Sequence, residues 1–143
     1  MVIESGDSED FDVKGYDIAA KAIADLNDRS YQLKFASKQR GREDELADRL
    51  LHCGIGRNQL NISSLDGNRE TLANLFSLVD IAILPSRTEG FGLSALEAIS
   101  AGLPVLVSDN SGIAEALKEV SIGPQCIVDS EDPADWADRK SVV

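Results

Sequence analysis

The chain has 143 residues, which is the usual size of one domain and is enough to build a hydrophobic core. Apolar residues make up 43% of the chain and charged residues 27%, a composition that is typical of soluble globular proteins and argues against a disordered chain. The formal net charge of −11 argues against binding to nucleic acid or to an anionic membrane surface, because both require a basic protein surface.

The amino-terminal part alternates between β-prone and helical segments. The short apolar start Met1–Ser5 predicts a first strand, and an acidic run follows it from Gly6 to Asp12. Tyr16–Leu26 predicts an amphipathic helix, because several of its apolar residues share one side. Tyr31–Ala36 is β-prone and predicts the second strand. The apolar side of the helix consists of Ile18, Ala22, Ile23 and Leu26.

The next segments continue this alternation. The basic stretch Ser37–Arg42 is either a solvated loop or a place where one cation faces a phosphate. Glu43–Cys53 predicts an amphipathic helix, and Gly54 is placed to end it. Leu60–Leu65 predicts a weaker strand towards the edge of the sheet. Arg69–Val79 has apolar residues at helical spacing and predicts a third helix.

The central part of the sequence predicts a strand, a glycine-rich loop, a helix and a second strand. Ile81–Leu84 is apolar without alternation, as expected of a strand covered on both faces of a parallel sheet, and Pro85 ends it. The loop Glu89-Gly90-Phe91-Gly92 leads into a helical segment. Gly102 is a predicted helix terminator, and Leu103–Val107 resumes a buried strand. The residues Leu93, Leu96 and Ile99 share one side of this helix.

The last part adds a short helix, a strand and a closing helix. The helix is predicted over Gly112–Glu119 and the strand over Cys126–Val128. Asp132 followed by Pro133 predicts the start of the closing helix, since a capping residue precedes a first-turn proline. Together the segments predict one α/β domain over residues 1–143. We expect a Rossmann-like, doubly wound parallel sheet in a three-layer α/β/α arrangement, with right-handed crossovers and strand order 3-2-1-4-5-6.

Two carboxylates flank the predicted start of the central helix. If that helix starts near Gly92, Glu97 lies roughly 7 Å further along its axis, at about 1.5 Å per residue. Glu89 lies in the loop before the helix. The helix start offers unpaired amides to an anion, and ligands of such sheets bind outside the carboxyl ends of the strands. A ligand with a phosphate in the middle and hydroxyls at both ends, such as a nucleotide-diphosphate sugar, fits this pattern.

The segment from Pro85 to Glu115 resembles the donor-binding half of retaining GT-B glycosyltransferases, family four in particular. Glu89 and Glu97 match the E-x7-E motif of that family. The resemblance implies one half of a GT-B fold. The other matching positions are Pro85-Ser86, Gly90-Phe91-Gly92-Leu93, Ala98, Gly102-Leu103-Pro104-Val105, Ser108 and Gly112-Ile113-Ala114-Glu115.

The resemblance also implies roles for single residues. Glu89 would contact the hydroxyls of the donor hexose, and Glu97 the ribose diol. The amides from Gly90 to Leu93 would face the phosphates of a UDP- or GDP-linked sugar. Lys14, which with Gly15 matches the lysine-glycine pair of the family, would be the remaining phosphate cation. The catalytic roles would thus fall to Glu89 and Lys14.

In GT-B enzymes, the resemblance implies, a donor domain and an acceptor domain close on each other. Retention is attributed to front-face attack within an ion pair, so that stabilising the departing diphosphate is the main catalytic task. No metal or other cofactor is obligatory. We expect the chain to hold only the donor half, with a closing helix that is cut short. We therefore expect glycosyl transfer only if a separate acceptor domain or a larger parent chain completes the site.

One departure from the family supports a second reading. Where the family has a glycine-arginine pair after its first strand, this chain has Glu4-Ser5-Gly6. A carboxylate in place of a phosphate-binding cation weakens donor binding. The glycine-rich turn expected after Ala36 is also missing. The alternative function is therefore a non-catalytic module of glycosyltransferase fold that serves ligand sensing or protein interaction within a larger protein.

Several single residues allow two interpretations. Arg87 either leans over the phosphates or is a solvated loop residue. Glu115 either contacts the donor or favours the first turn of its helix. His52 is explained by its place at a helix end. Trp136 is expected to pack its helix onto the sheet, with sugar stacking as the alternative.

The remaining features concern the compartment. Cys53 and Cys126 match neither a disulfide framework nor a zinc-site spacing, and we expect them to be reduced. No signal-type segment follows Met1, and no apolar run reaches membrane length. The cytoplasm is therefore the expected location.

Overall fold

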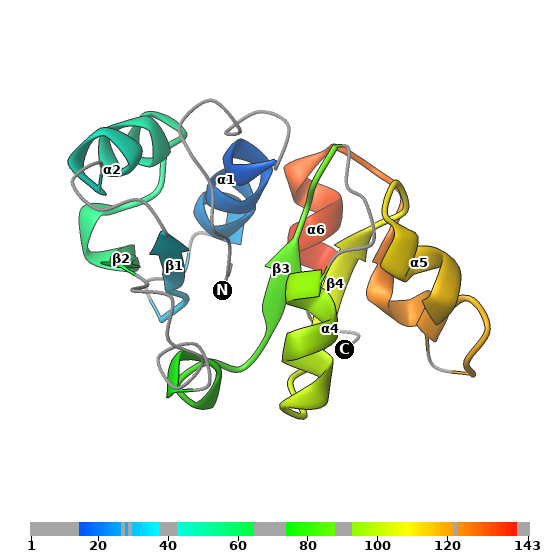
Figure 1. Ribbon diagram of the computed structural model, residues 1–143. Coiled ribbons are helices and arrows are strands. Elements are labelled where there is room, and N and C mark those ends of the chain that lie inside the picture. Colours follow the sequence, from blue (N-terminus) through cyan, green and yellow to red (C-terminus); the bar gives the residue numbers. More distant parts are fainter. Residues whose placement is uncertain are drawn as a thin grey trace.

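The computed structural model describes residues 15–26, 28, 30–37, 43–64, 74–87, 93–121 and 123–139 (Figure 1). The predicted first strand Met1–Ser5, the acidic run after it and the basic stretch 38–42 lie outside the described residues. The same holds for Lys14 and for the loop from Glu89 to Gly92. Of the helix predicted over Arg69–Val79, residues 74–79 are described; residues 74–77 are helical, and Leu78 and Val79 lie beyond the end of the helix.

The described strands form two parallel sheets. In the first, β1 (Leu33–Ser37) pairs with β2 (Leu60–Ser64), with Leu33 opposite Leu60. In the second, β4 (Val105–Ser108) lies between β3 (Ala82–Leu84) and β5 (Ile127–Val128). These two groups are the halves 3-2 and 4-5-6 of the predicted strand order. The predicted strand between them lies outside the described residues.

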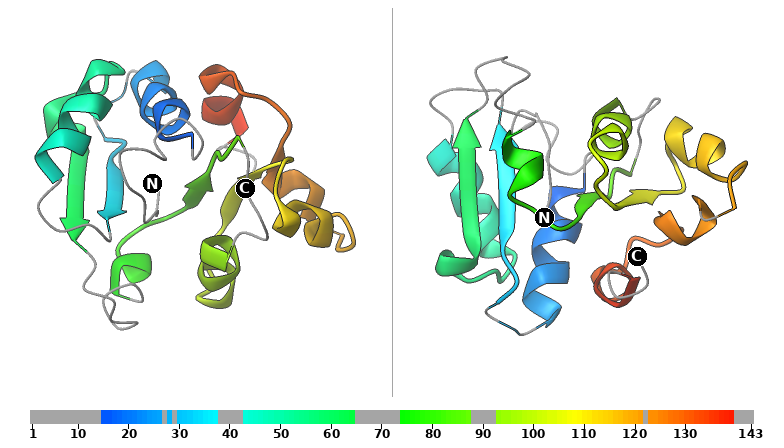
Figure 2. Two further views of the ribbon diagram at one scale, coloured as in Figure 1. Left: turned by 45° about the horizontal axis from the view of Figure 1, so that its top comes forward. Right: turned by 90° about the horizontal axis from the view of Figure 1, so that it is seen from below.

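Helices cover both faces of the sheet of β3, β4 and β5 (Figure 2). On one side, α1 (Tyr16–Leu26) packs against α6 (Pro133–Arg139). On the opposite side lie α4 (Leu93–Ser100) and α5 (Gly112–Leu117). The helix α2 (Glu43–His52) packs on β2 and on α1. Two short 3₁₀ turns, η2 (Arg57–Gln59) and η3 (Gly123–Cys126), precede β2 and β5.

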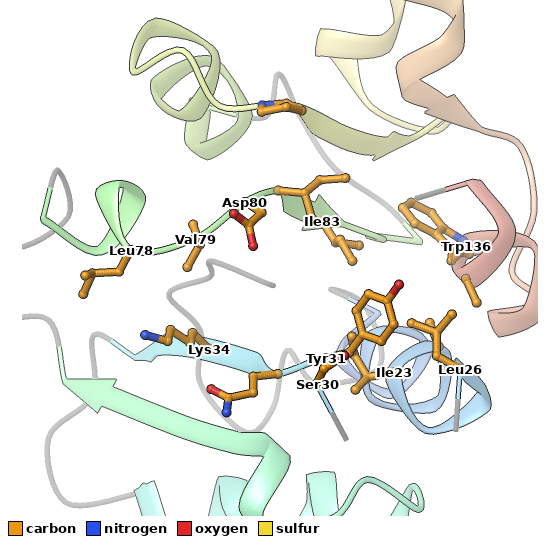
Figure 3. Close-up of a pocket in the computed structure, with 15 residues that line it drawn as sticks. Ile23, Leu26, Ser30, Tyr31, Lys34, Leu78, Val79, Asp80, Ile83 and Trp136 are labelled. Carbon is orange, nitrogen blue, oxygen red and sulfur yellow. The ribbon is translucent and has the colours of Figure 1, made fainter. Parts of the chain in front are cut away.

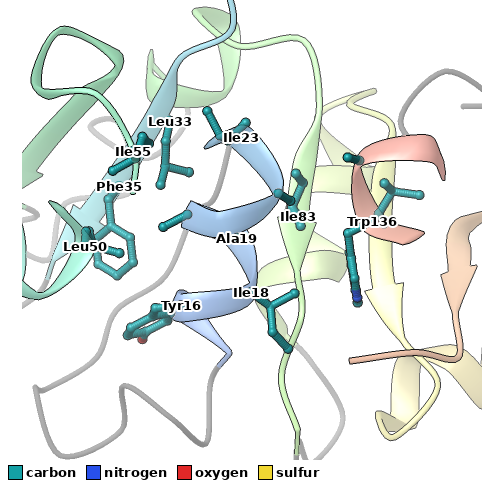
Figure 4. Close-up of a cluster of buried hydrophobic side chains, with 14 of the residues drawn as sticks. Tyr16, Ile18, Ala19, Ile23, Leu33, Phe35, Leu50, Ile55, Ile83 and Trp136 are labelled. Carbon is teal, nitrogen blue, oxygen red and sulfur yellow. The ribbon is translucent and has the colours of Figure 1, made fainter. Parts of the chain in front are cut away.

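The short central strands supply side chains to two separate hydrophobic clusters. Ile83, Leu106 and Val128 face the cluster that α1, α2 and α6 build, which Figure 4 shows around Ala19 and Trp136. Their neighbours along the strands, such as Leu84 and Val107, face the cluster on the side of α4 and α5. Because successive side chains of a strand point to opposite faces, a strand of this kind is apolar throughout. The sequence prediction of strands buried on both faces is confirmed.

The end of α4 forms a Schellman motif, as the sequence led us to expect of Gly102. The amide of Leu103 donates to the carbonyl of Ala98 at 3.0 Å, and the amide of Gly102 donates to that of Ile99 at 2.9 Å. Gly102 has a φ of 81°, in the left-handed region that glycine adopts without a Cβ clash.

The buried side of α4 is not the side on which Leu96 and Ile99 lie. Ala95 and Ala98 are completely buried, whereas Leu96 and Ile99 are 42% and 37% exposed. Alanine lets the helix lie close to the sheet, and this close approach decides which side faces it. The side chain of Leu93 lies outside the described part.

Candidate functional site

A cleft opens at the carboxyl ends of β3, β4 and β5, the edge at which ligands bind in sheets of this type. Its volume is about 270 Å³. Residues that directly follow the three strands form most of its wall, and the side chain of Ile18 on α1 closes one side. Among the lining residues are Ser86, Arg87, Ser108, Asn110, Ser130 and Glu131.

The start of α1 lies directly against the end of β3. Gly15 precedes the helix with a φ of 71°, and a Cβ placed on it would come within 1.8 Å of the carbonyl oxygen of Pro85. Only glycine therefore fits this position, both for its backbone angle and for the space it leaves. Gly15, the glycine of the lysine-glycine pair, thus lies at the carboxyl edge of the sheet.

Arg87 connects three segments at the same edge. Its Nη1 and Nη2 atoms donate to the two carboxylate oxygens of Asp17 at 2.8 and 3.0 Å. Its Nε lies 3.3 Å from Glu131, whose side chain is 66% exposed. Burial acts to raise the pKa of Asp17, but the hydrogen bonds and charge of Arg87 outweigh it and hold this pKa below its ordinary value. Of the two interpretations of Arg87, the structure therefore supports neither: the guanidinium is paired with carboxylates.

The N-terminus of α5 is built from serines. Ser111 Oγ donates to the carbonyl of Ser108 at 2.8 Å and accepts from the amide of Ala114 at 3.3 Å, as a helix cap does. Its hydroxyl therefore ties the end of β4 to the first turn of α5.

Glu115 lies on the exposed surface of α5. Lys118 Nζ lies 3.3 Å from Glu115 and 3.0 Å from Asp109, which lines the cleft. Hydrogen bonds to Asp109 and Glu115 raise the pKa of Lys118. Glu115 thus pairs with Lys118, the C-cap residue of α5, and among the described residues Lys118 links it to Asp109 in the cleft lining.

Two other predicted site residues are described, and both lie on α4. Leu93 is the first residue of the helix, which agrees with a helix start near Gly92. Glu97 lies one turn further on the exposed side of α4. Neither Glu97 nor Glu115 lines the cleft. Lys14, Glu89, Gly90, Phe91 and Gly92 lie outside the described residues.

The charge of the cleft determines which ligand groups suit it. Arg87 is the basic residue of its described lining, and Asp109, Asp129 and Glu131 are acidic. Carboxylates accept hydrogen bonds from hydroxyls and repel phosphates. The described lining therefore favours the hydroxyl groups of a ligand over its anionic groups. Sequence reasoning missed Asp17, because nothing in the first turn of a helix indicates a partner 70 residues away.

A larger cavity of about 480 Å³ lies between β1 and β3 (Figure 3). Apolar side chains such as Ile23, Ile83 and Trp136 form much of its wall, and Lys34 and Asp80 add charge. Asp80 precedes β3 and Tyr31 precedes β1, so the cavity reaches the amino ends of these strands. It therefore does not belong to the carboxyl edge.

The remaining single residues have structural surroundings. Trp136 is buried between α6 and the sheet, and its Nε1 donates to the carbonyl of Ser130 at 2.8 Å, which confirms the packing role. His52 is exposed at the end of α2. Cys53 and Cys126 are in no disulfide. Within the described segments, no group of three or more metal-ligating side chains is placed to hold a metal ion, and no helix could span a membrane.

Two parallel sheets, helices on both faces and a cleft at the carboxyl edge define a Rossmann-like α/β domain. The sequence family described as "Family 4 Glycosyltransferase in conflict systems" matches residues 1–142. The D-inositol 3-phosphate glycosyltransferase of Corynebacterium jeikeium is 32% identical over 132 residues, which are 88% of this chain and 31% of that enzyme. The chain thus spans less than a third of the length of the curated relatives it matches.

Solved structures agree on the fold. The C-terminal domain of a glycosyl transferase group 1 family protein from Francisella tularensis superposes with a TM-score of 0.72 at 18% identity, over 98% of this chain and 72% of that one. A UDP-forming trehalose-phosphate synthase from Burkholderia xenovorans gives 0.71 at 17% identity, over 99% of this chain and 35% of that one. The chain belongs to glycosyltransferase family 4 and has the α/β fold of one half of a GT-B enzyme.

Proposed function

We propose that the chain is the donor-binding domain of a retaining GT-B glycosyltransferase and binds a nucleotide-diphosphate sugar. Glu89 binds the hexose hydroxyls and Glu97 the ribose diol. The amides of residues 90–93 and the ammonium of Lys14 bind the diphosphate, and Glu115 is a further donor contact. Transfer requires an acceptor domain, because the donor half alone leaves the acceptor unplaced and loses a proximity contribution of about 7 to 11 kcal/mol.

The match of the family over residues 1–142 is the observation that carries this proposal. The order of the elements supports it: α4 follows β3, and in parallel strand–helix units the N-terminus of the helix lies at the carboxyl edge of the sheet, where its amides can bind an anion. One solved neighbour is described as UDP-forming, which favours UDP as the first nucleotide to test. The proposal needs no metal or other cofactor.

Isothermal titration calorimetry with UDP, GDP, UDP-glucose and GDP-mannose tests the proposal. We expect at least one of the four to bind with a dissociation constant below the millimolar range. If all of them bind only in the millimolar range or not at all, the proposed donor binding is wrong.

A second comparison tests the role of Glu97. Glu97→Ala should weaken nucleotide binding about tenfold, because a charged acceptor of the ribose hydroxyls is lost. Glu119 is exposed like Glu97 but is not part of the proposed site. Glu119→Ala is therefore the matched control and should leave the affinity unchanged. Neither variant should change the free energy of unfolding by more than about 0.5 kcal/mol. Equal affinities of the two variants would remove Glu97 from the site.

The charge of the cleft favours a second candidate function. Three acidic residues line the cleft beside the paired Arg87. In addition, the sequence has Glu4-Ser5-Gly6 where the family has a glycine-arginine pair that contacts the diphosphate. A module of this fold that senses a hydroxyl-rich ligand or binds a protein does not need a diphosphate site. Such a module would bind none of the four nucleotides, so the same titrations distinguish the two candidates.

A further inference from the structure

Two segments that are distant in the sequence meet twice at the carboxyl edge of the sheet. The backbone of Gly15 lies against the carbonyl of Pro85, where no Cβ fits. Two residues further along each segment, Asp17 and Arg87 form a bidentate ion pair. The first segment follows directly on Lys14, and the second leads directly to Glu89. In the sequence, each described segment therefore adjoins a residue of the proposed donor site.

We propose that the pair Asp17–Arg87 is a positioning contact that keeps segments 15–17 and 85–87 in one relative position for donor binding. This inference rests on the proposed function. Arg87 acts through the two segments and does not touch the diphosphate. The affinity for the donor then depends on the ion pair between Asp17 and Arg87, although the nucleotide does not touch either side chain.

The geometry of Arg87 supports a positioning role over a phosphate-binding one. Both of its terminal nitrogens face Asp17, and its Nε faces Glu131. The two carboxylates already offset the positive charge of this guanidinium, which lowers its attraction for a phosphate. Two parallel hydrogen bonds also fix the plane of the guanidinium, which a single contact does not. The side chain of Asp17 is only 18% exposed, so solvent screens the pair incompletely.

Two aspartates of α1 provide a matched pair of variants. Asp17, in the first turn, pairs with Arg87, whereas Asp25, in the last turn, is exposed and lines neither cavity. We expect Asp17→Asn to weaken UDP binding about tenfold, because a charge-assisted pair is lost. Asp25→Asn should change the affinity less than twofold. The double variant Asp17→Arg with Arg87→Asp restores an ion pair of reversed polarity and should recover part of the affinity. No recovery is expected if the single variant loses affinity because it is misfolded.

Hydrogen exchange followed by mass spectrometry gives a second readout that needs no nucleotide. In Asp17→Asn, amides of both peptides 13–19 and 83–93 should exchange about tenfold faster, while peptides from β4 and α5 keep their rates. If the wild-type chain binds no nucleotide, the proposed function is wrong. The exchange rates alone then test whether the pair Asp17–Arg87 holds the two segments together. Unchanged exchange in both peptides, or equal UDP affinities of Asp17→Asn and Asp25→Asn, would overturn the inference.

Discussion

At the scale of single residues, two glycines with similar backbone angles have different surroundings. Gly15 and Gly102 both have positive φ, at 71° and 81°. A Cβ on Gly15 would meet the carbonyl of Pro85, whereas a Cβ on Gly102 would meet nothing within 4 Å. The sequence indicated Gly102 as a helix terminator. It could not reveal the contact of Gly15, because Pro85 is distant in the chain.

This difference predicts two unequal effects on stability. Gly102→Ala should lower the free energy of unfolding by about 1 kcal/mol, the usual cost of a left-handed alanine. Gly15→Ala should cost about 1 to 3 kcal/mol more, because the backbone of Pro85 has to move. Urea unfolding of the two variants measures both values. Equal losses would mean that the contact with Pro85 adjusts without cost.

The ion pair of Asp17 predicts a dependence of stability on pH. Since the folded state holds the pKa of Asp17 below the ordinary value of 3.8, its contribution is present above that value and is lost as the pH falls through the lower, folded pKa. The difference in unfolding free energy between wild type and Asp17→Asn should therefore be constant near neutral pH and shrink below about pH 3.8. Urea unfolding at several pH values measures it, and a constant difference down to acid pH would contradict the assignment.

At the scale of elements, the sequence predicted most segments and their order. The helix over Tyr16–Leu26 is confirmed at both ends, and Asp132 caps α6 through a hydrogen bond from the amide of Ala134 at 3.0 Å. These features are local, so composition and spacing reveal them. The buried side of α4 could not be predicted from hydrophobicity, because the small residues Ala95 and Ala98 pack against the sheet while the larger Leu96 and Ile99 do not.

The packing of α6 can be tested through its tryptophan. Trp136 is 1% exposed, whereas Leu96 on α4 is 42% exposed. Trp136→Ala should lower the free energy of unfolding by about 3 to 5 kcal/mol, as buried aromatic truncations do. Leu96→Ala is the matched control for a large apolar residue and should cost less than about 1 kcal/mol. Thermal or urea unfolding compares them, and similar losses would mean that α6 contributes little to the core.

At the scale of the whole molecule, the candidate site was predicted less completely than the fold. The sequence placed Glu97 and Leu93 on the helix after the glycine loop, and the structure agrees on that helix. The pairing of Arg87 with Asp17 and the acidic lining of the cleft depend on residues from separate segments. Such long-range charge contacts leave no pattern in the sequence, so spacing alone could not predict them.

Donor binding should also stabilise the whole domain. A nucleotide at a concentration of 100 times its dissociation constant adds about 2.7 kcal/mol to the free energy of unfolding, if it binds only the folded state. We therefore expect UDP or GDP to raise the melting temperature in a concentration-dependent way. Uridine without phosphates is the control and should have a smaller effect. An unchanged melting temperature at millimolar nucleotide would count against the donor site.

The three short strands β3, β4 and β5 also determine how this half of the protein comes apart. Each strand contributes alternate side chains to both clusters. Neither layer of helices can therefore detach without losing contacts with strands against which the other layer also packs. Melting of one layer would expose apolar side chains of the same three strands that support the other layer. We therefore expect both layers to be lost together, in one cooperative step, when the domain is heated.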